Sequence, residues 1–186
     1  LKNIANITSG HLFKNSIEND PNGNINIIQI KNINENSELD INNINKLNLS
    51  IKESHFIKKN NILFKAKSSK PLAVNVNKII DNTIATFHFF IIRMKNKNIL
   101  PEYLTWFINK KSTQKYFQKM AGGTVIPIIN KKILDELEII IPDLNIQKKI
   151  IQIKRLYDKE KEIINKIISK RESLVEALLL KLINQK

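Results

Sequence analysis

The alternation of apolar and polar residues is most regular in the last part of the chain. After Pro142 no Gly or Pro interrupts the sequence as far as Lys186, and apolar residues recur at steps of three and four. This spacing predicts one long amphipathic helix over residues 143–186. At about 1.5 Å per residue the helix would be on the order of 60 Å long, about twice the width of a small domain. Its apolar stripe consists of Ile146, Ile150, Ile153, Tyr157, Ile164, Ile167, Leu174 and Leu178.

A helix of this length is expected to project from a compact head, and its exposed stripe needs a second helix to cover it. Glu160 and Arg171 stand at two positions where the three-four spacing calls for apolar residues. In an antiparallel pair of helices such residues can set the register, because a misaligned partner would leave a charge buried. Alternatively, the helix curves or its stripe shifts there.

Residues 1–142 show mixed patterns that predict an α+β head. Pro101 suits the first turn of a helix, Ser112 and Asn130 can cap two more, and Gly122-Gly123 can end the second. Short runs rich in β-branched and aromatic residues predict the strands. The expected strands lie at residues 26–33, 72–76, 83–94 and 138–141, and the expected helices at 101–108, 112–121 and 131–134. Two domains are predicted, a head at 1–142 and a helix at 143–186.

Composition adds a strong positive charge, formally +14, that is unevenly distributed. Residues 65–142 hold 13 basic and five acidic residues, whereas residues 1–64 are almost balanced. Nucleic acid is the obvious polyanion for such a surface, because neutralised phosphates release counterions. A codon bias remains an alternative, since Asn, Ile and Lys, all abundant here, are encoded by A/T-rich triplets.

Two segments are candidates for contacts with DNA. The first is basic and rich in hydroxyl groups, which suits phosphate binding from a loop between strands. The second contains a Gly-Gly pair whose backbone N–H groups could approach a phosphate. The alternatives are a solvated loop for the first segment and a helix end followed by a turn for the second. The candidate residues are Lys65, Lys67, Ser68, Ser69 and Lys70 in the first segment, and Gly122, Gly123 and Thr124 in the second.

Base-reading residues are left open, because Asn and Gln suit adenine edges but Asn is abundant throughout this chain. The candidates near predicted strand ends are Gln29, Asn32, Asn75 and Asn77.

The sequence gives no sign of catalytic chemistry. There is no cysteine, so disulfides and thiolate metal sites are excluded, and the three His residues lie far apart without acidic partners at metal spacing. No glycine-rich cofactor or ATP loop, adenine-methylation motif or metal-dependent nuclease motif is found. We therefore predict no cofactor, no metal and no catalytic activity.

The sequence also lacks an apolar stretch long enough to cross a membrane, and no signal peptide is recognisable. A cytoplasmic location of bacterial type is expected. The chain begins with Leu rather than Met, which indicates either a trimmed chain or part of a longer product.

From Thr83 onward the sequence resembles the specificity subunit of type I restriction–modification systems. The most specific element is a proline, a short gap, a glutamine and then a long helix, in residues 141–147. Asn60-Asn61 stand where the family usually has Gly-Asp before a strand. The other similar elements are residues 84–93, 100–104, 121–124 and 126–127, with Gln114, Phe117, Leu134, Leu137, Ile139 and Ile150, and more loosely Leu1, Ile4, Ile7, Gly10 and residues 27–33.

The resemblance implies a target recognition domain that binds double-stranded DNA, followed by one spacer helix that forms an antiparallel coiled coil. Full-length members of the family carry two such domains, and separate subunits methylate and cleave. The chain is thus expected to read a half-site of a bipartite target, to self-associate or pair with a second half, and to dock methyltransferase subunits. The restriction subunit would be an indirect partner that joins the chain through the assembled complex.

Two other functions stay open. The chain could be the recognition module of a single-chain restriction-methylation enzyme. It could also be a coiled-coil interaction protein that mimics the specificity subunit and does not bind DNA.

Overall fold

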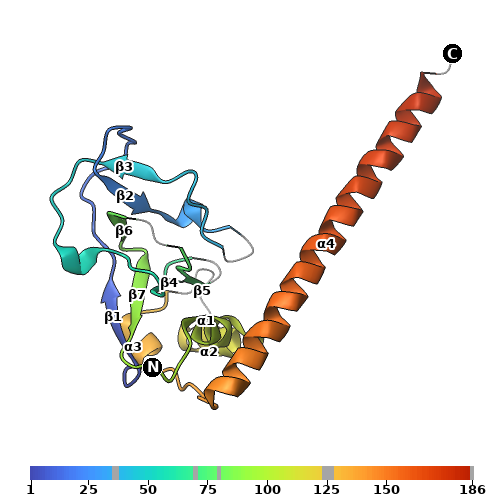
Figure 1. Ribbon diagram of the computed structural model, residues 1–186. Helices are drawn as coiled ribbons and strands as arrows, with labels where there is room; N and C mark the ends of the chain where they lie inside the picture. The colour runs from blue at the N-terminus through green and yellow to red at the C-terminus, as the bar shows by residue number, and fades with distance from the viewer. Residues whose placement is uncertain (35–37, 69–70, 79–80, 123–127, 185–186) are drawn as a thin grey trace. The chain divides into compact units, whose positions relative to one another are not determined.

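The computed structural model describes every residue except 35–37, 69–70, 79–80, 123–127 and 185–186. The chain divides into two compact units, residues 1–147 and residues 148–186. The first contains β1 to β7 and α1 to α3, and the second belongs to the long helix α4 (Figure 1). The fold is therefore α+β with a long C-terminal helix, as predicted. The boundary predicted after residue 142 separates a DNA-binding head from a pairing helix, and this functional division stays a prediction.

The larger sheet of the head has four antiparallel strands in the order β1-β7-β4-β5. The two central strands are apolar on both faces, and Ile62, Leu63 and Phe64 of β4 are fully buried. Such continuous apolar runs are typical of strands covered on both sides. The phenyl ring of Phe64 lies 5.3 Å from that of Phe117 in α2, so this helix packs against the sheet. The strands are β1 at Ala5–Ser9, β4 at Ile62–Lys65, β5 at Leu72–Asn75 and β7 at Phe89–Met94.

The smaller sheet has three strands in the order β3-β2-β6, with β2 antiparallel to β3 and parallel to β6. Its strands are β2 at Ile25–Ile28, β3 at Asn45–Leu47 and β6 at Thr83–Ala85; short 3-10 turns lie at Ile30–Asn32 and Glu53–His55. Because β6 leads into β7 through residues 86–88, this turn carries the chain from one sheet to the other. The backbone N–H of Thr86 donates to the carbonyl of Ile28, and that of Ala66 donates to the carbonyl of His88.

Gly10 lies where the chain leaves β1 and passes this turn. Its N–H donates to the carbonyl of Phe89 at 2.9 Å. A Cβ atom at this position would lie 2.2 Å from the carbonyl oxygen of Thr86 and 2.6 Å from that of Ala85. Both obstructing atoms belong to backbone that is fixed by the sheets, so only glycine fits here.

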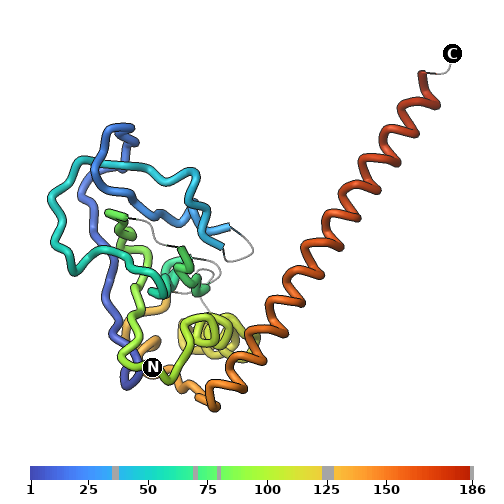
Figure 2. Tube along the Cα trace, in the orientation of Figure 1, coloured from blue at the N-terminus to red at the C-terminus, as the bar shows by residue number. Residues whose placement is uncertain are grey.

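Three helices complete the head: α1 at Pro101–Asn109, α2 at Lys111–Met120 and α3 at Lys131–Asp135. Asn109, at the end of α1, bonds the edge strand β5 twice, accepting from the N–H of Ala73 and donating to its carbonyl. Asn130 caps α3 as predicted, since its side chain accepts from the N–H of Ile133 at 2.9 Å. The Cα trace shows α3 beside the N-terminal residues, where the N–H of Lys2 donates to the carbonyl of Asp135 (Figure 2).

The junction before α4 is held by one fully buried amide side chain, that of Gln147. Its Oε1 accepts from the N–H of Leu100 at 2.9 Å, and its Nε2 donates to the carbonyls of Asn98 at 2.9 Å and Pro142 at 2.8 Å. The carboxylate of Asp143 accepts from two N–H groups of the first turn, as an N-cap does. The first turn of α4 is therefore bonded to the loop that precedes α1, within the head.

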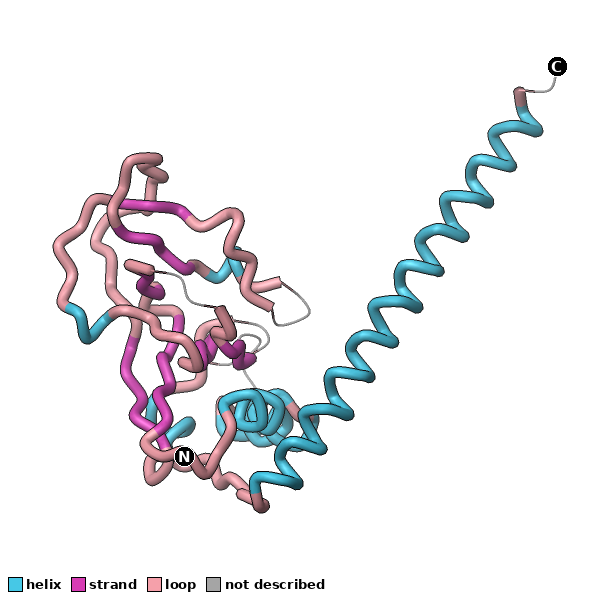
Figure 3. Tube along the Cα trace, in the orientation of Figure 1, coloured by secondary structure: helices cyan, strands magenta, loops and turns pink. Residues whose placement is uncertain are grey.

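Helix α4 runs without interruption from Leu144 to Ile183 (Figure 3). Most of its residues after Gln147 are exposed, among them large apolar side chains such as Ile153, Tyr157 and Leu178. No helix in the described part of the chain has the length and apolar character needed to cross a membrane.

Residues 138–141, predicted as a strand, do not form one. The alternation is real, because Leu137 is buried and Ile139 is half-buried between exposed neighbours. However, this segment does not pair with a neighbouring strand in the described structure. The carbonyl of Ile140 instead accepts from the hydroxyl of Tyr103 at 2.7 Å. An extended segment held by a side chain has the same sequence pattern as a strand.

Three further expectations need correction. The strand expected at residues 26–33 ends at Ile28, and Ile30–Asn32 form a 3-10 turn. Residues 83–94 form two strands in different sheets rather than one, because the turn at residues 86–88 separates them. Ser112 does not cap α2, whose N-cap is Lys110 without a side-chain bond. The neighbouring Thr113 and Gln114 instead donate to the carbonyls that end α1.

The turn before β4 forms despite the missing glycine. Asn60 adopts a positive φ of 68°, a conformation that Asn tolerates better than most residues. The side chain of Asn61 accepts from the N–H of Lys58 at 2.9 Å.

We predict that Gly10→Ala destabilises the head by about 1–3 kcal/mol, the usual cost of forcing extra volume into a packed site. Gly122→Asn is the matched control, because Gly122 has a φ of 69° and open space around the position of a Cβ, and Asn tolerates that φ. Urea unfolding at one fixed protein concentration measures both. Equal stability of Gly10→Ala and the wild type would contradict the close approach described above.

We predict that Gln147→Leu lowers the free energy of unfolding by about 3 kcal/mol, because backbone groups of Asn98, Leu100 and Pro142 lose their partly buried hydrogen bonds and each unsatisfied group costs about 1–3 kcal/mol. Gln152→Leu, an exposed position on the same helix, should change the free energy of unfolding by less than about 0.5 kcal/mol. Thermal or urea unfolding compares the two. Similar effects of both substitutions would show that the buried amide does not hold the junction.

Candidate nucleic-acid interface

The first predicted DNA-binding segment follows β4 and lies at the surface of the head. Lys67 is exposed, while Lys65 and Ser68 are half-buried. The other two predicted residues, Ser69 and Lys70, lie outside the described residues.

This segment is fixed by strand-like bonds on both sides. The N–H of Ala66 donates to the carbonyl of His88 at 3.0 Å, and the carbonyl of Ala66 accepts from the N–H of Ile129 at 3.1 Å. Lys67 itself forms an isolated antiparallel bridge with Ile128. The basic segment is therefore placed between the turn that joins the two sheets and the residues just before α3.

A cation and aromatic rings meet at this place. The ammonium group of Lys67 lies 4.4 Å from the ring centroid of Phe87. The rings of Phe87 and His88 lie 4.1 Å apart at 37°. Lysine over an aromatic face gains about 0.5–1 kcal/mol at an exposed site. The side chain of Lys67 is thus partly ordered before any ligand is present.

His88 supplies a neutral imidazole rather than a second charge. Burial lowers the pKa of His88 below its ordinary value of 6.5, and the positive charge of Lys67 lowers it further. Its Nδ1 lies 3.3 Å from the hydroxyl of Thr86. At pH 7 the positive charge beside this ring therefore comes from lysine.

The second predicted segment is described only at Gly122. This residue follows the end of α2 with a φ of 69°, and its N–H is directed to the carbonyl of Lys119 at 3.3 Å. The helix-end interpretation is therefore confirmed for Gly122. Gly123 and Thr124 lie outside the described residues, and phosphate binding by this segment stays a prediction.

The structure brings together residues that sequence reasoning did not combine. Phe87, His88 and Ile128 join Lys67, and Ile128 is 59% exposed although it is apolar. The only sequence signal for this cluster is the break in alternation within residues 83–94. We call Lys65, Lys67, Ser68, Phe87, His88 and Ile128 the Lys67 surface.

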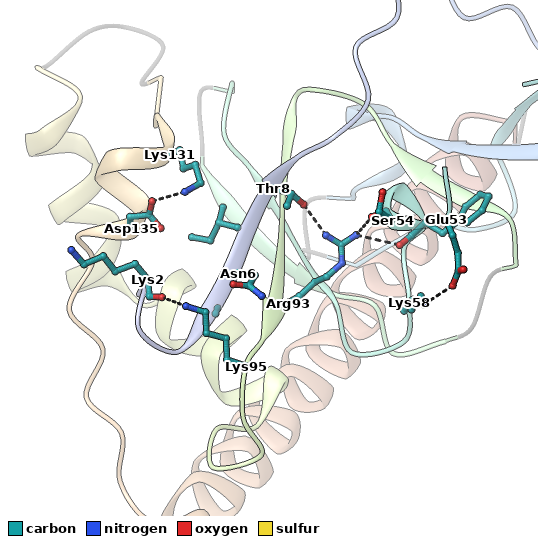
Figure 4. Close-up of a pocket in the computed structure, with 13 residues that line it drawn as sticks. Lys2, Asn6, Thr8, Glu53, Ser54, Lys58, Arg93, Lys95, Lys131 and Asp135 are labelled. Carbon is teal, nitrogen blue, oxygen red and sulfur yellow. Dashed lines mark hydrogen bonds and ion pairs between the residues drawn. The ribbon is translucent and has the colours of Figure 1, made fainter. Parts of the chain in front are cut away.

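A second basic area of the head is an open groove of about 890 Å³ (Figure 4). Acidic residues Glu53 and Asp135 also line it, and most of its cations bond within the protein. Lys58 pairs with Glu53, Lys131 pairs with Asp135, and Lys95 donates to the carbonyl of Lys2. The cationic side chains that line the groove are Lys2, Lys58, Arg93, Lys95 and Lys131.

Arg93 is the most firmly held cation of this groove. Its guanidinium donates to the hydroxyl of Thr8 at 2.7 Å and to the carbonyls of Ser54 and Phe56 at 3.1 and 3.3 Å. Burial lowers the pKa of Arg93 from its ordinary value, although the group stays charged at neutral pH. Arg93 therefore ties the segment at residues 53–56 to β1 and β7. The Lys67 surface, rather than this groove, is the better candidate for DNA.

One of the candidate base-reading residues, Asn32, instead forms hydrogen bonds that stabilise the fold. Asn32 is buried, its Oδ1 accepts from the N–H of Gln29, and its Nδ2 donates to the carbonyl of Asn43. Its amide cannot reach a base edge. Within the described residues, no group of three or more His, Cys, Asp and Glu side chains is arranged to hold a metal ion.

Comparison with solved structures gives a similar fold in a type I restriction-modification system S subunit from M. genitalium, with a TM-score of 0.57 and 18% sequence identity. The match covers 87% of this chain and 38% of that one, so this chain spans well under half the length of the S subunit it matches. A search of curated protein sequences finds no match.

Comparison with protein families matches residues 1–171 to the family described as "Type I restriction modification DNA specificity domain". The match covers the whole head and most of α4, and it agrees with the resemblance of residues 83–150 to this family. The chain therefore belongs to the type I restriction modification DNA specificity domain family.

Proposed function

We propose that the head reads one half-site of a bipartite DNA target and that α4 pairs with a second helix and docks a methyltransferase subunit. In this role the chain is non-catalytic, and a restriction subunit joins through the complex. The observation that carries the proposal is the Lys67 surface, where a partly ordered cation, two rings and an exposed Ile lie side by side in a DNA specificity domain.

The chemistry of this surface suits the backbone and edges of a duplex. Lysine neutralises a phosphate as a point charge, and hydroxyl groups such as that of Ser68 add hydrogen bonds that fix position. The apolar Ile128 and the ring of Phe87 offer contacts to sugars or to a thymine methyl group. In this proposal Ser69, Lys70, Gly123 and Thr124 extend the surface, and the bases that are read remain open.

The proposal for α4 is supported by the exposure of its stripe. In the described structure Ile153, Tyr157 and Leu174 are each more than half exposed, and Ile164 and Ile167 nearly so. Burying such side chains gains about 1.5–3 kcal/mol each, which is the driving force for helix pairing. If two copies pair about a two-fold axis, the two half-sites are related by the same symmetry.

A second apolar stripe supports docking of a further subunit. Beside the predicted stripe lies a second row of exposed apolar residues, which follow one another at steps of seven, four and three. They are Ile168, Val175, Leu179 and Leu182. A two-helix coiled coil covers the seam and leaves such flanking residues at its edge. We assign this flank to the methyltransferase.

For DNA binding we predict that Lys67→Gln weakens affinity several-fold for all sequences alike and lowers the salt dependence by about one phosphate contact. The control is Lys58→Gln, which removes a lysine from the groove where it pairs with Glu53. Fluorescence anisotropy with duplex DNA, over a range of salt and with and without the methyltransferase subunit, measures both.

Equal behaviour of the two variants would remove the Lys67 surface from the DNA interface. Binding to the methyltransferase that is insensitive to salt, without affinity for DNA, would instead support an interaction protein that mimics the specificity subunit.

For docking we predict that Leu179→Glu reduces binding to the methyltransferase at least tenfold, since a charge would be buried in an apolar contact, while self-association is unchanged. Ser169→Glu, an exposed polar position on α4, is the control and should change neither. Calorimetry measures docking and sedimentation measures self-association. A loss of self-association in Leu179→Glu would show that this flank belongs to the pairing seam.

A further inference from the structure

Two residues of opposite charge interrupt the apolar stripe of α4. We call the stripe together with these two residues the seam. Glu160 and Arg171 are both exposed, and neither forms an ion pair within the described part of the chain. The seam alternates steps of four and three from Ile146 to Leu178 when these two residues are included. They therefore occupy true seam positions, and the repeat does not shift at either of them.

An antiparallel pair of identical helices has a simple geometric rule. Each residue faces the residue that lies equally far on the other side of the two-fold axis. If Glu160 of one copy faces the partner's Arg171, the axis passes between Asn165 and Lys166. The same charged layer then occurs twice, once on each side of the axis.

The other seam layers between Ile153 and Leu178 pair apolar residues in this register, and Ile150 faces the partner's Lys181 beyond them. Ile164 faces the partner's Ile167 and Tyr157 faces the partner's Leu174, each layer occurring twice. In the outermost of these layers Ile153 faces the partner's Leu178. The six apolar residues are compatible with this register. Because nothing in the three-four spacing requires the two charges to match, their complementarity is what selects it.

Other arrangements leave the charges without partners. A slip of one heptad in one direction sets Glu160 against the partner's Ile164, and a slip in the other sets it against the partner's Leu178. A parallel pair in register sets Glu160 against the partner's Glu160 and Arg171 against the partner's Arg171. A charge buried against apolar residues or against a like charge is unfavourable, so both register and direction are selected.

We infer that, in an antiparallel pair of two copies of α4, the register sets Glu160 of each copy against the partner's Arg171, with an ion pair in each of the two layers. This inference rests on the proposed pairing of α4 and adds its register and the two residues that set it. The occupant is a second copy because the two charges are symmetric about one point of the same helix. The register fixes how far apart the two Gln147 anchors lie, and with them the separation of the half-sites.

The test is a charge reversal at both positions, followed by sedimentation equilibrium over a range of concentrations. Glu160→Arg and Arg171→Glu each place like charges opposite one another in two layers, and each should weaken self-association at least tenfold. The double variant restores both pairs and should return to within about threefold of the wild type. Glu176→Arg, an exposed reversal away from the seam, is the control and should match the wild type.

A mixture of the two single variants provides a second measurement. Each variant alone should be largely monomeric, but the mixture should form a heterodimer because both charged layers become complementary. Circular dichroism of each variant checks that the helix is retained.

The outcomes separate this inference from the proposed function. If the wild type dimerises and both single variants dimerise equally well, the register is wrong while helix pairing stands. If the wild type does not self-associate at any concentration tested, pairing between copies is itself refuted.

Discussion

The organisation of this protein depends on a helix that cannot bury its own apolar side chains. Helix α4 spans 40 residues, and most of its stripe is exposed in the described part of the chain. In the first turn of the helix, the buried side chain of Gln147 makes three hydrogen bonds to backbone groups of the head. Because the first turn of α4 is held by the head and its apolar stripe is exposed, we propose that α4 pairs with a second helix. This pairing is the physical basis of the proposed recognition of two DNA half-sites. The charged layers formed by Glu160 and Arg171 then decide which pairing is stable.

The head separates cations that hold the fold from cations available to a ligand. The guanidinium of Arg93 donates to Thr8 and to the carbonyls of Ser54 and Phe56, and these bonds tie residues 53–56 to β1 and β7. Lys67 rests on an aromatic face, which orders the side chain but leaves its ammonium group exposed. This difference explains why an excess of positive charge alone does not locate an interface. The place at which the chain crosses between its two sheets combines a fixed backbone with an accessible charge.

Local rules predicted much of the fold. The period of α4, the proline that opens α1 and the Asn130 cap act within a few residues, so the sequence reveals them directly. The strands predicted at residues 138–141 and 83–94 were wrong in detail, because alternation does not show which strand, if any, a segment pairs with. The Lys67 surface depends on bonds from Ala66 to His88 and to Ile129. Contacts over such sequence distances follow from topology, so only Lys65, Lys67 and Ser68 of this surface could be named beforehand.

The central claim is that two copies of α4 lie antiparallel and hold two heads apart. The chain has no cysteine, so a single Lys148→Cys substitution allows one nitroxide label per copy just beyond the head. Pulsed electron paramagnetic resonance then measures the distance between the two labels of a dimer. At about 1.5 Å per residue, the register about Asn165 and Lys166 predicts a distance on the order of 50 Å. A distance below about 20 Å, as expected for parallel helices packed about 10 Å apart, would contradict the account.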